Sequence, residues 1–130
     1  MRTLNISLLV FILSITISAQ WYQQNSGTAN TLMGVSFTDQ NNGTAVGEYN
    51  TILRTTDGGT NWFTQTSGTT DWFNDVCFTD ANTGTVVSAM GHIFGTTDGG
   101  TTWTLQISPS SNFWRVCFTD ANNGTAVGSQ

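Results

Sequence analysis

A repeat of 41 residues constrains the fold of this chain more than any other feature of its sequence. The segment TTDGGT at 55–60 recurs at 96–101, and the tripeptide Phe-Thr-Asp at 37–39 recurs at 78–80 and 118–120. A repeat of this length is one supersecondary unit that buries its apolar face against the next copy. The sequence therefore predicts an array of similar units.

Each repeat has the pattern of four short β-strands. Apolar residues alternate in the first strand of each unit, Asp-x-Asn-x-Gly follows it as a turn, and Asp-Gly-Gly marks a tight hairpin further on. Four antiparallel strands in 40 to 45 residues is the spacing of a propeller blade. We predict an all-β fold, a partial β-propeller with four-stranded antiparallel blades, about two complete blades and flanking strands. The predicted strands cover 32–38, 44–47, 51–56 and from 61 onward in one unit, 73–79, 85–89, 92–97 and from 102 onward in the next, and 113–119 and 125–128 in the last.

The phase of the repeat predicts how the chain is divided. Residues 20–130 hold the repeats: a lone fourth strand at 20–29, blades at 30–70 and 71–111, and an incomplete blade at 112–130. Because propellers have about four to eight blades, we expect further blades of the same chain. The alternative is a short protein that closes by self-association.

The first 19 residues are typical of a signal peptide. A basic residue, Arg2, precedes an apolar run at 4–17, and Ser18-Ala19 supplies a small-residue cleavage site. The run is shorter than the roughly 20 residues needed to span a bilayer. We therefore expect a secreted or periplasmic protein that is not inserted in the membrane after cleavage.

The charge of the chain excludes one class of partner. The formal net charge is −5, and the three basic residues are all arginines. Such a surface cannot neutralise a row of phosphates, so we expect no nucleic-acid partner.

The hairpin motif Thr-x-Asp-x-Gly-x-x-Trp has a structural explanation. Its aspartate can accept backbone N–H groups of the turn, its glycines permit positive φ, and its tryptophan can bury apolar area over the turn. The motif resembles the Asp-box, or bacterial neuraminidase repeat, and the frame around it (Leu32, Val35, Phe37, Asp39, then Gly43, Val46 and Gly47) resembles the photosystem II stability/assembly factor-like propeller family. This resemblance implies a non-enzymatic binding or assembly scaffold. The structural Asp-box residues are Thr55, Asp57, Gly59, Trp62, Thr96, Asp98, Gly100 and Trp103.

Other motifs favour neither a metal site nor catalysis. Asp39-x-Asn41-x-Gly43 begins like a calcium loop, but Asn50 stands where the closing glutamate belongs. His92 is the only histidine and Glu48 the only glutamate, so we predict no catalytic, cofactor or metal site. Asp71 and Asp75, outside the repeated turns, have no evident partner. Cys77 and Cys117 occupy equivalent positions in successive units and are expected to be free, packed thiols.

Residues that differ between otherwise equivalent positions are candidates for ligand binding: Tyr49, Trp72, Trp114 and Arg115. Aromatic rings and an arginine at blade ends suit a protein or carbohydrate ligand, although aromatic residues also pack within strands. The predicted function is a secreted non-enzymatic binding scaffold. The alternatives are a fragment of an Asp-box glycoside hydrolase with its catalytic residues elsewhere, and an adhesive module of a larger cell-surface protein.

Overall fold

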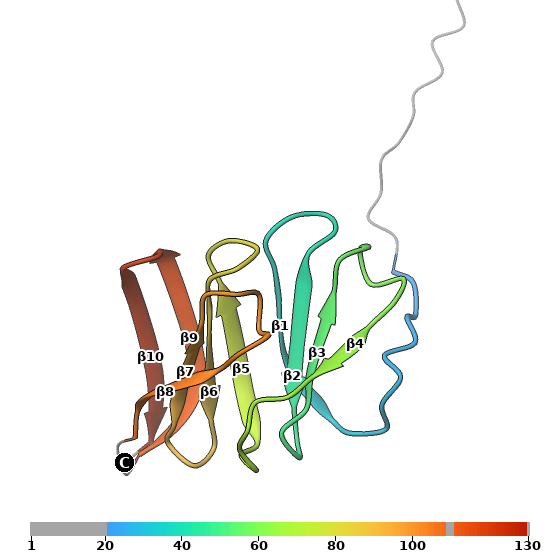
Figure 1. The fold of residues 1–130 in the computed structure, drawn as a ribbon. Coiled ribbons are helices and arrows are strands. Elements are labelled where there is room, and N and C mark those ends of the chain that lie inside the picture. The colour runs from blue at the N-terminus through green and yellow to red at the C-terminus, as the bar shows by residue number, and fades with distance from the viewer. Residues whose placement is uncertain (1–20, 109–110, 130) are drawn as a thin grey trace, which may run out of the picture.

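The computed structural model describes residues 21–108 and 111–129, and their strands form three antiparallel sheets (Figure 1). The predicted all-β architecture with four-stranded antiparallel units is confirmed. The predicted signal peptide lies outside the described residues. No helix in the described ranges is long and apolar enough to cross a membrane. The strands are β1 (Leu32–Phe37), β2 (Gly43–Gly47), β3 (Ile52–Thr55) and β4 (Phe63–Gln65); β5 (Phe73–Phe78), β6 (Gly84–Ser88), β7 (Ile93–Thr96) and β8 (Thr104–Ile107); and β9 (Asn112–Asp120) and β10 (Asn123–Ser129).

Each four-stranded sheet is an antiparallel meander in chain order, β1-β2-β3-β4 and β5-β6-β7-β8, and β9 pairs with β10. The two full sheets have the same register, since Val35 faces Ala45 in one and Val76 faces Val86 in the other. The sheets stand side by side as blades, with β5 packed between β1 and β9 (Figure 1). We call them the first, second and third blades.

The connections gather at two opposite edges of the blades (Figure 1). One edge, the box face, consists of the turns after the first and third strands, at 38–42, 56–62, 79–83, 97–103 and 121–122. The other edge, the link face, consists of the turns at 48–51 and 89–92 and of segments 27–31 and 66–72, which lead into β1 and β5. Loops carried on a rigid scaffold are where binding residues concentrate.

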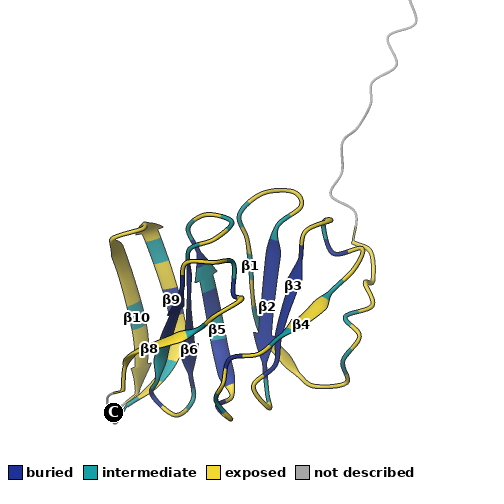
Figure 2. Ribbon diagram, in the orientation of Figure 1, coloured by how far each residue is buried: buried dark blue, intermediate teal, exposed yellow. Residues whose placement is uncertain are grey.

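The core lies between the first and second blades (Figure 2). Its buried side chains come from both sheets: Val46, Ile52, Phe73, Val76, Phe78, Val86 and Phe94. Phe73 is fully buried, and its ring meets that of Phe94 edge to face at 6.0 Å. Edge-to-face pairs at this separation add to the stabilisation by apolar burial.

Equivalent residues differ in burial according to whether a blade covers them. Val35 in β1 is 62% exposed, whereas Val76, its counterpart in β5, is 3% exposed because the first blade packs over it. Each unit thus obtains its core from its neighbour, as expected for a repeat array.

The prediction of a lone fourth strand at 20–29 is wrong for the part that the structure describes, because residues 21–29 contain no strand. A fourth strand is held by hydrogen bonds to a third strand, and among the described residues no third strand pairs with this segment. The segment instead contacts the first blade through Gln24, whose Nε2 donates to the carbonyl of Gly58 at 3.1 Å.

Candidate binding face

The Asp-box turns are self-contained hydrogen-bonded units on the box face. Asp57 Oδ1 accepts the backbone N–H of Asn61 at 2.9 Å and the hydroxyl of Thr55 at 2.8 Å. The Thr55 hydroxyl oxygen accepts the N–H of Gly59 at 2.9 Å, and Gly59 has a φ of 87°. The second blade repeats this arrangement around Asp98.

These bonds stabilise the ionised carboxylates. Those from the backbone and side chain of Asn61 and from Thr55 hold the pKa of Asp57 below its usual range. The side chain and backbone of Thr102 and the hydroxyl of Thr96 lower the pKa of Asp98 to about 2. Because donors within the protein already bind these carboxylate oxygens, the role of the Asp-box aspartates is to stabilise the turns.

The box turns yield a stability prediction. Replacing Thr55, which is fully buried, with valine removes the acceptor for the buried Gly59 N–H, and we expect the free energy of unfolding to fall by about 1–3 kcal/mol. Urea titration measures this loss. Thr60→Val is the matched control, because the Thr60 hydroxyl is exposed and donates only to the Asp57 carbonyl. Equal stability of Thr55→Val and wild type would contradict the assignment.

A glutamine at the same position of successive repeats binds the box turn of the following blade, a contact not predicted from the sequence. Gln24 Nε2 donates to the carbonyl of Gly58, and its Oε1 lies 3.4 Å from the indole Nε1 of Trp62. Gln65 Nε2 likewise donates to the carbonyl of Gly99 at 2.8 Å. Gln106 is the next residue in this series. The recurrence of glutamine every 41 residues was the sequence signal for this contact.

The tryptophans of the boxes pack within their own blades. Trp62 meets Phe37 edge to face at 6.1 Å, and Trp103 meets Phe78 in the same way at 6.0 Å. Each tryptophan thereby joins its box turn to the first strand of the blade.

Arg54 contributes to the contact between the first and second blades. Its guanidinium donates to the Thr44 hydroxyl at 2.9 Å and to the Ala81 carbonyl at 2.7 Å, and lies 5.1 Å from the centre of the Phe78 ring. Burial lowers its pKa. This arginine is therefore a structural residue.

The segments that begin like calcium loops form Asx turns. Asp39 Oδ1 accepts the N–H groups of Asn41 and Asn42 at 2.7 and 2.8 Å, and Asp80 and Asp120 make equivalent bonds. Within the described ranges, no group of three histidine, cysteine, aspartate or glutamate residues could hold a metal ion.

Both cysteines are free thiols, as predicted. The Cys77 sulfur accepts the N–H of Phe118 in the third blade at 3.3 Å, just as the Ser36 hydroxyl accepts the N–H of Phe78 at 3.0 Å. Both side chains thus satisfy an edge N–H of the following blade. The prediction of two packed thiols is wrong for Cys117, which is exposed because no described strand lies beyond it.

Two of the four predicted ligand-binding residues meet on the link face. The rings of Tyr49, in the turn between β2 and β3, and Trp72, just before β5, lie 5.1 Å apart. Their exposed fractions are 59% and 42%. The structure thus joins the edges of the first and second blades through an exposed aromatic pair.

This aromatic pair is held by backbone contacts. Tyr49 and Asn50 have φ values of 53° and 54°, which bulky residues rarely adopt. The N–H of Asn50 donates to the Asp71 carbonyl at 2.9 Å, and its side-chain amide donates to the Thr69 carbonyl at 2.8 Å. These bonds tie the turn to the chain segment that carries Trp72.

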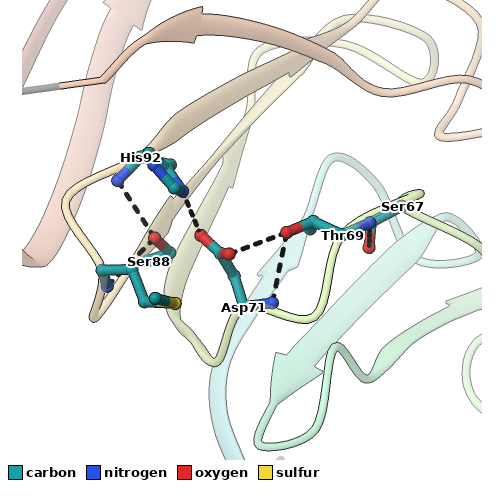
Figure 3. A network of polar contacts seen from close by, with 6 residues as sticks. Ser67, Thr69, Asp71, Ser88 and His92 are labelled. Carbon is teal, nitrogen blue, oxygen red and sulfur yellow. Dashed lines mark hydrogen bonds and ion pairs between the residues drawn. The ribbon is translucent and has the colours of Figure 1, made fainter.

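Asp71, which directly precedes Trp72 in the chain, carries a buried carboxylate at the centre of a polar network (Figure 3). Asp71 is 3% exposed, its Oδ2 lies 2.6 Å from His92 Nδ1, and its Oδ1 accepts the Thr69 hydroxyl at 2.7 Å. The Ser88 hydroxyl oxygen accepts the backbone N–H groups of Met90 and His92. In a nucleophilic relay the serine hydroxyl would instead bond the imidazole ring, so this network fixes the turn.

Neither Asp71 nor His92 has a partner that is evident from the sequence alone. In the first blade the equivalent residues are Asn30 and Thr51, and Asn30 Nδ2 donates to Thr51 Oγ1 at 2.9 Å. In both blades, polar side chains occupy two positions that are 21 residues apart. This recurrence was the sequence signal for a contact between them. Asp75 also has a partner, since its Oδ2 accepts the Val116 N–H at 2.9 Å.

The other two predicted residues, in the third blade, are not part of the Tyr49–Trp72 ring contact. Trp114 and Arg115 are consecutive in β9, and the Arg115 guanidinium donates to the Trp114 carbonyl at 2.9 Å. No ring contact among the described residues joins Trp114 to the aromatic pair.

The comparisons with known proteins agree with one another. Residues 13–73 match the model of the family described as photosynthesis system II assembly factor YCF48. A solved structure described as YCF48 bound to D1 peptide is 27% identical, with a TM-score of 0.70, and the match covers 77% of this chain and 35% of that one. YCF48 from Cyanidioschyzon merolae is 17% identical, with a TM-score of 0.68 and coverages of 78% and 36%. No curated protein matches the sequence.

The chain thus spans about a third of the length of the two solved structures. The family match covers residues 13–73, which include the first blade, and the structural match extends over most of the chain. Together with the paired Asp-box turns and the four-stranded blades, these matches show that the chain is a partial β-propeller with Asp-box repeats that is similar to the photosystem II assembly factor YCF48.

Proposed function

We propose that this chain is an exported, non-enzymatic binding scaffold whose link face binds a segment of a partner protein. The observation that carries the proposal is the exposed aromatic pair of Tyr49 and Trp72, held between two blades. Rigid aromatic side chains supply large contact area with little loss of side-chain entropy, and they are enriched among the residues that dominate binding energy.

The relatives support a protein ligand. A YCF48 of known structure, 27% identical to this chain, is described as bound to D1 peptide. Here the box face is occupied by its own turn hydrogen bonds, whereas the link face presents exposed rings. The leader at residues 1–19 supports export.

The carboxylates support a role without catalysis. A retaining glycosidase needs two carboxyl groups about 5 Å apart across the sugar. Asp71 is engaged by Thr69 and His92, and Asp75 by the Val116 backbone. Both aspartates are therefore engaged in structural contacts, which favours a binding role over acid–base catalysis.

Selection from a random peptide library displayed on phage, with the purified exported protein as bait, tests the proposal. We expect enriched peptides to bind wild type and to lose affinity at least about tenfold on Trp72→Ala, since truncating a central aromatic anchor costs more than about 1 kcal/mol. Phe63→Ala is the matched control, because Phe63 is 62% exposed on the outer strand β4.

Two results would overturn the proposal. Peptides that bind Trp72→Ala and wild type equally would remove the link face from binding. Hydrolysis of a fluorogenic sialoside by the wild-type protein would instead support the glycoside hydrolase alternative.

A further inference from the structure

A cavity of about 300 Å³ on the link face of the first blade has a wall chemistry unlike that of the aromatic pair. Segment 27–30 forms one side, the turn at 49–51 forms another, and the end of β4 closes the third. No aspartate, glutamate, arginine, lysine or histidine lines it. Its principal polar and aromatic side chains are those of Thr28, Asn30, Tyr49, Thr64, Thr66 and Ser67.

The absence of charge in this wall restricts the ligand. A phosphate, carboxylate or ammonium group would lose hydration here without meeting an opposite charge, which is unfavourable. A wholly apolar ligand would cover hydroxyl and amide groups without replacing their hydrogen bonds to water. A neutral molecule with several hydroxyl groups meets neither penalty.

The cavity also holds uncommitted hydrogen-bonding groups. The hydroxyls of Thr64 and Thr66 make no hydrogen bond to any other described residue. Asn30 Nδ2 donates to Thr51 Oγ1 at 2.9 Å, which fixes the orientation of the amide, and its Oδ1 accepts no bond within the described part of the chain. A hydroxyl can donate and accept hydrogen bonds, and an amide oxygen can accept two. The wall can therefore bond to the hydroxyl groups of a polyol, which also donate and accept.

Tyr49 adds an exposed ring to the rim of the cavity. It has a φ of 53° in a turn whose two central residues both have positive φ, a position that normally takes asparagine or glycine. The second blade has Met90 and Gly91 at the two equivalent positions. A bulky residue held in a sparsely populated conformation is a signal of function, and the face of an aromatic ring complements the C–H face of a sugar.

The same positions in the second blade carry different chemistry. Leu105 and Ile107 replace Thr64 and Thr66, and the Asp71–His92 pair replaces Asn30 and Thr51. The shared frame of the two blades therefore does not require hydroxyl groups at the end of the fourth strand.

We propose that this cavity binds one neutral sugar ring, with Tyr49 against the ring face and Asn30, Thr64 and Thr66 bonding its hydroxyls. The volume is at the lower end of the range of ligand pockets, about 300–1,000 Å³, which suits a single ring. This inference goes beyond the proposed protein-binding function, because the cavity is lined by residues of the first blade and not by Trp72.

Saturation-transfer NMR of the full exported chain with separate neutral saccharides (glucose, galactose, mannose and N-acetylglucosamine) tests the site, with sialic acid as the charged probe. We expect transfer from the protein to at least one neutral sugar and none to sialic acid. For that sugar, Tyr49→Ala and Thr66→Val should each weaken binding at least fivefold in a titration. Thr104→Val is the matched control, because Thr104 is an exposed hydroxyl residue at the start of β8 in the second blade.

No transfer to any neutral sugar, or unchanged binding by Thr66→Val, would overturn the inference. Preferential transfer to sialic acid would do so as well. Thermal melting of each variant separates lost binding from lost folding. Thr66→Val should retain the affinity of wild type for the selected peptides, whereas Trp72→Ala should retain sugar binding, so failure of one proposal is distinguishable from failure of the other.

Discussion

Replacing Phe73 with alanine is expected to lower the free energy of unfolding by about 3–5 kcal/mol, the loss found when a large aromatic side chain is removed from a closed core. Phe73 is fully buried, and its ring packs against Phe94 from the same blade. It belongs to the cluster that joins the first and second blades through Val46 and Ile52. Its truncation therefore weakens one sheet and also the contact between two sheets. Urea titration followed by tryptophan fluorescence measures the change.

Leu32 provides the control for this prediction. It occupies the equivalent position at the start of β1, yet it is 38% exposed because no described blade covers it. Leu32→Ala is expected to cost about 1 kcal/mol or less, since little apolar area returns to water. Equal losses at the two positions would show that the two strands are buried to the same extent in solution, which the structure contradicts.

The sequence was sufficient to predict the blades because local chemistry determines them. Period-2 alternation marks the first strand of each unit, and the Asp-Gly-Gly hairpins require the positive φ that Gly58 and Gly59 adopt. The lone strand at 20–29 was predicted wrongly because motif similarity between WYQQNSGT and WFTQTSGT does not supply a pairing partner. A strand exists only where another strand meets its hydrogen-bonding groups.

Contacts between units were harder to predict. The clamp from Gln65 to Gly99 and the anchoring of Arg54 on Ala81 join successive repeats. Local sequence shows which residues recur but not which neighbour they reach. The glutamine period was visible, whereas the arginine has no counterpart at the equivalent position, Gly95.

The sequence predicted individual residues of the candidate site but not which of them lie together in the fold. Tyr49 and Trp72 were singled out because they break the repeat, and only the fold brings their rings to 5.1 Å. Trp114 and Arg115 break the repeat as well, yet they lie in β9 of the third blade and do not join that ring contact. Departure from a repeat therefore identifies candidates, and the topology selects among them.

Asp71 supplies a second large effect, one that depends on pH. Burial raises the pKa of this carboxyl, but hydrogen bonds from Ser88, Thr69 and His92 outweigh burial and hold the pKa below its usual range. A carboxyl whose pKa is lower in the folded than in the unfolded chain stabilises the fold fully above its unfolded pKa of about 3.9. That contribution disappears as the pH falls through the folded pKa.

Asp71→Ala is therefore expected to cost about 1–3 kcal/mol at pH 7, because it removes the acceptor for the half-buried Thr69 hydroxyl and the partner of His92. The stability gap between variant and wild type should narrow as the pH is lowered from 5 towards 2. The box and Asx-turn aspartates also titrate there, but they are present in both proteins and cancel in the difference. Asn30→Ala, the exposed equivalent in the first blade, should give a smaller gap that does not change with pH. Urea titrations at several pH values measure both gaps, and a gap for Asp71→Ala that stays constant down to pH 2 would show that its ionised carboxylate contributes nothing to stability.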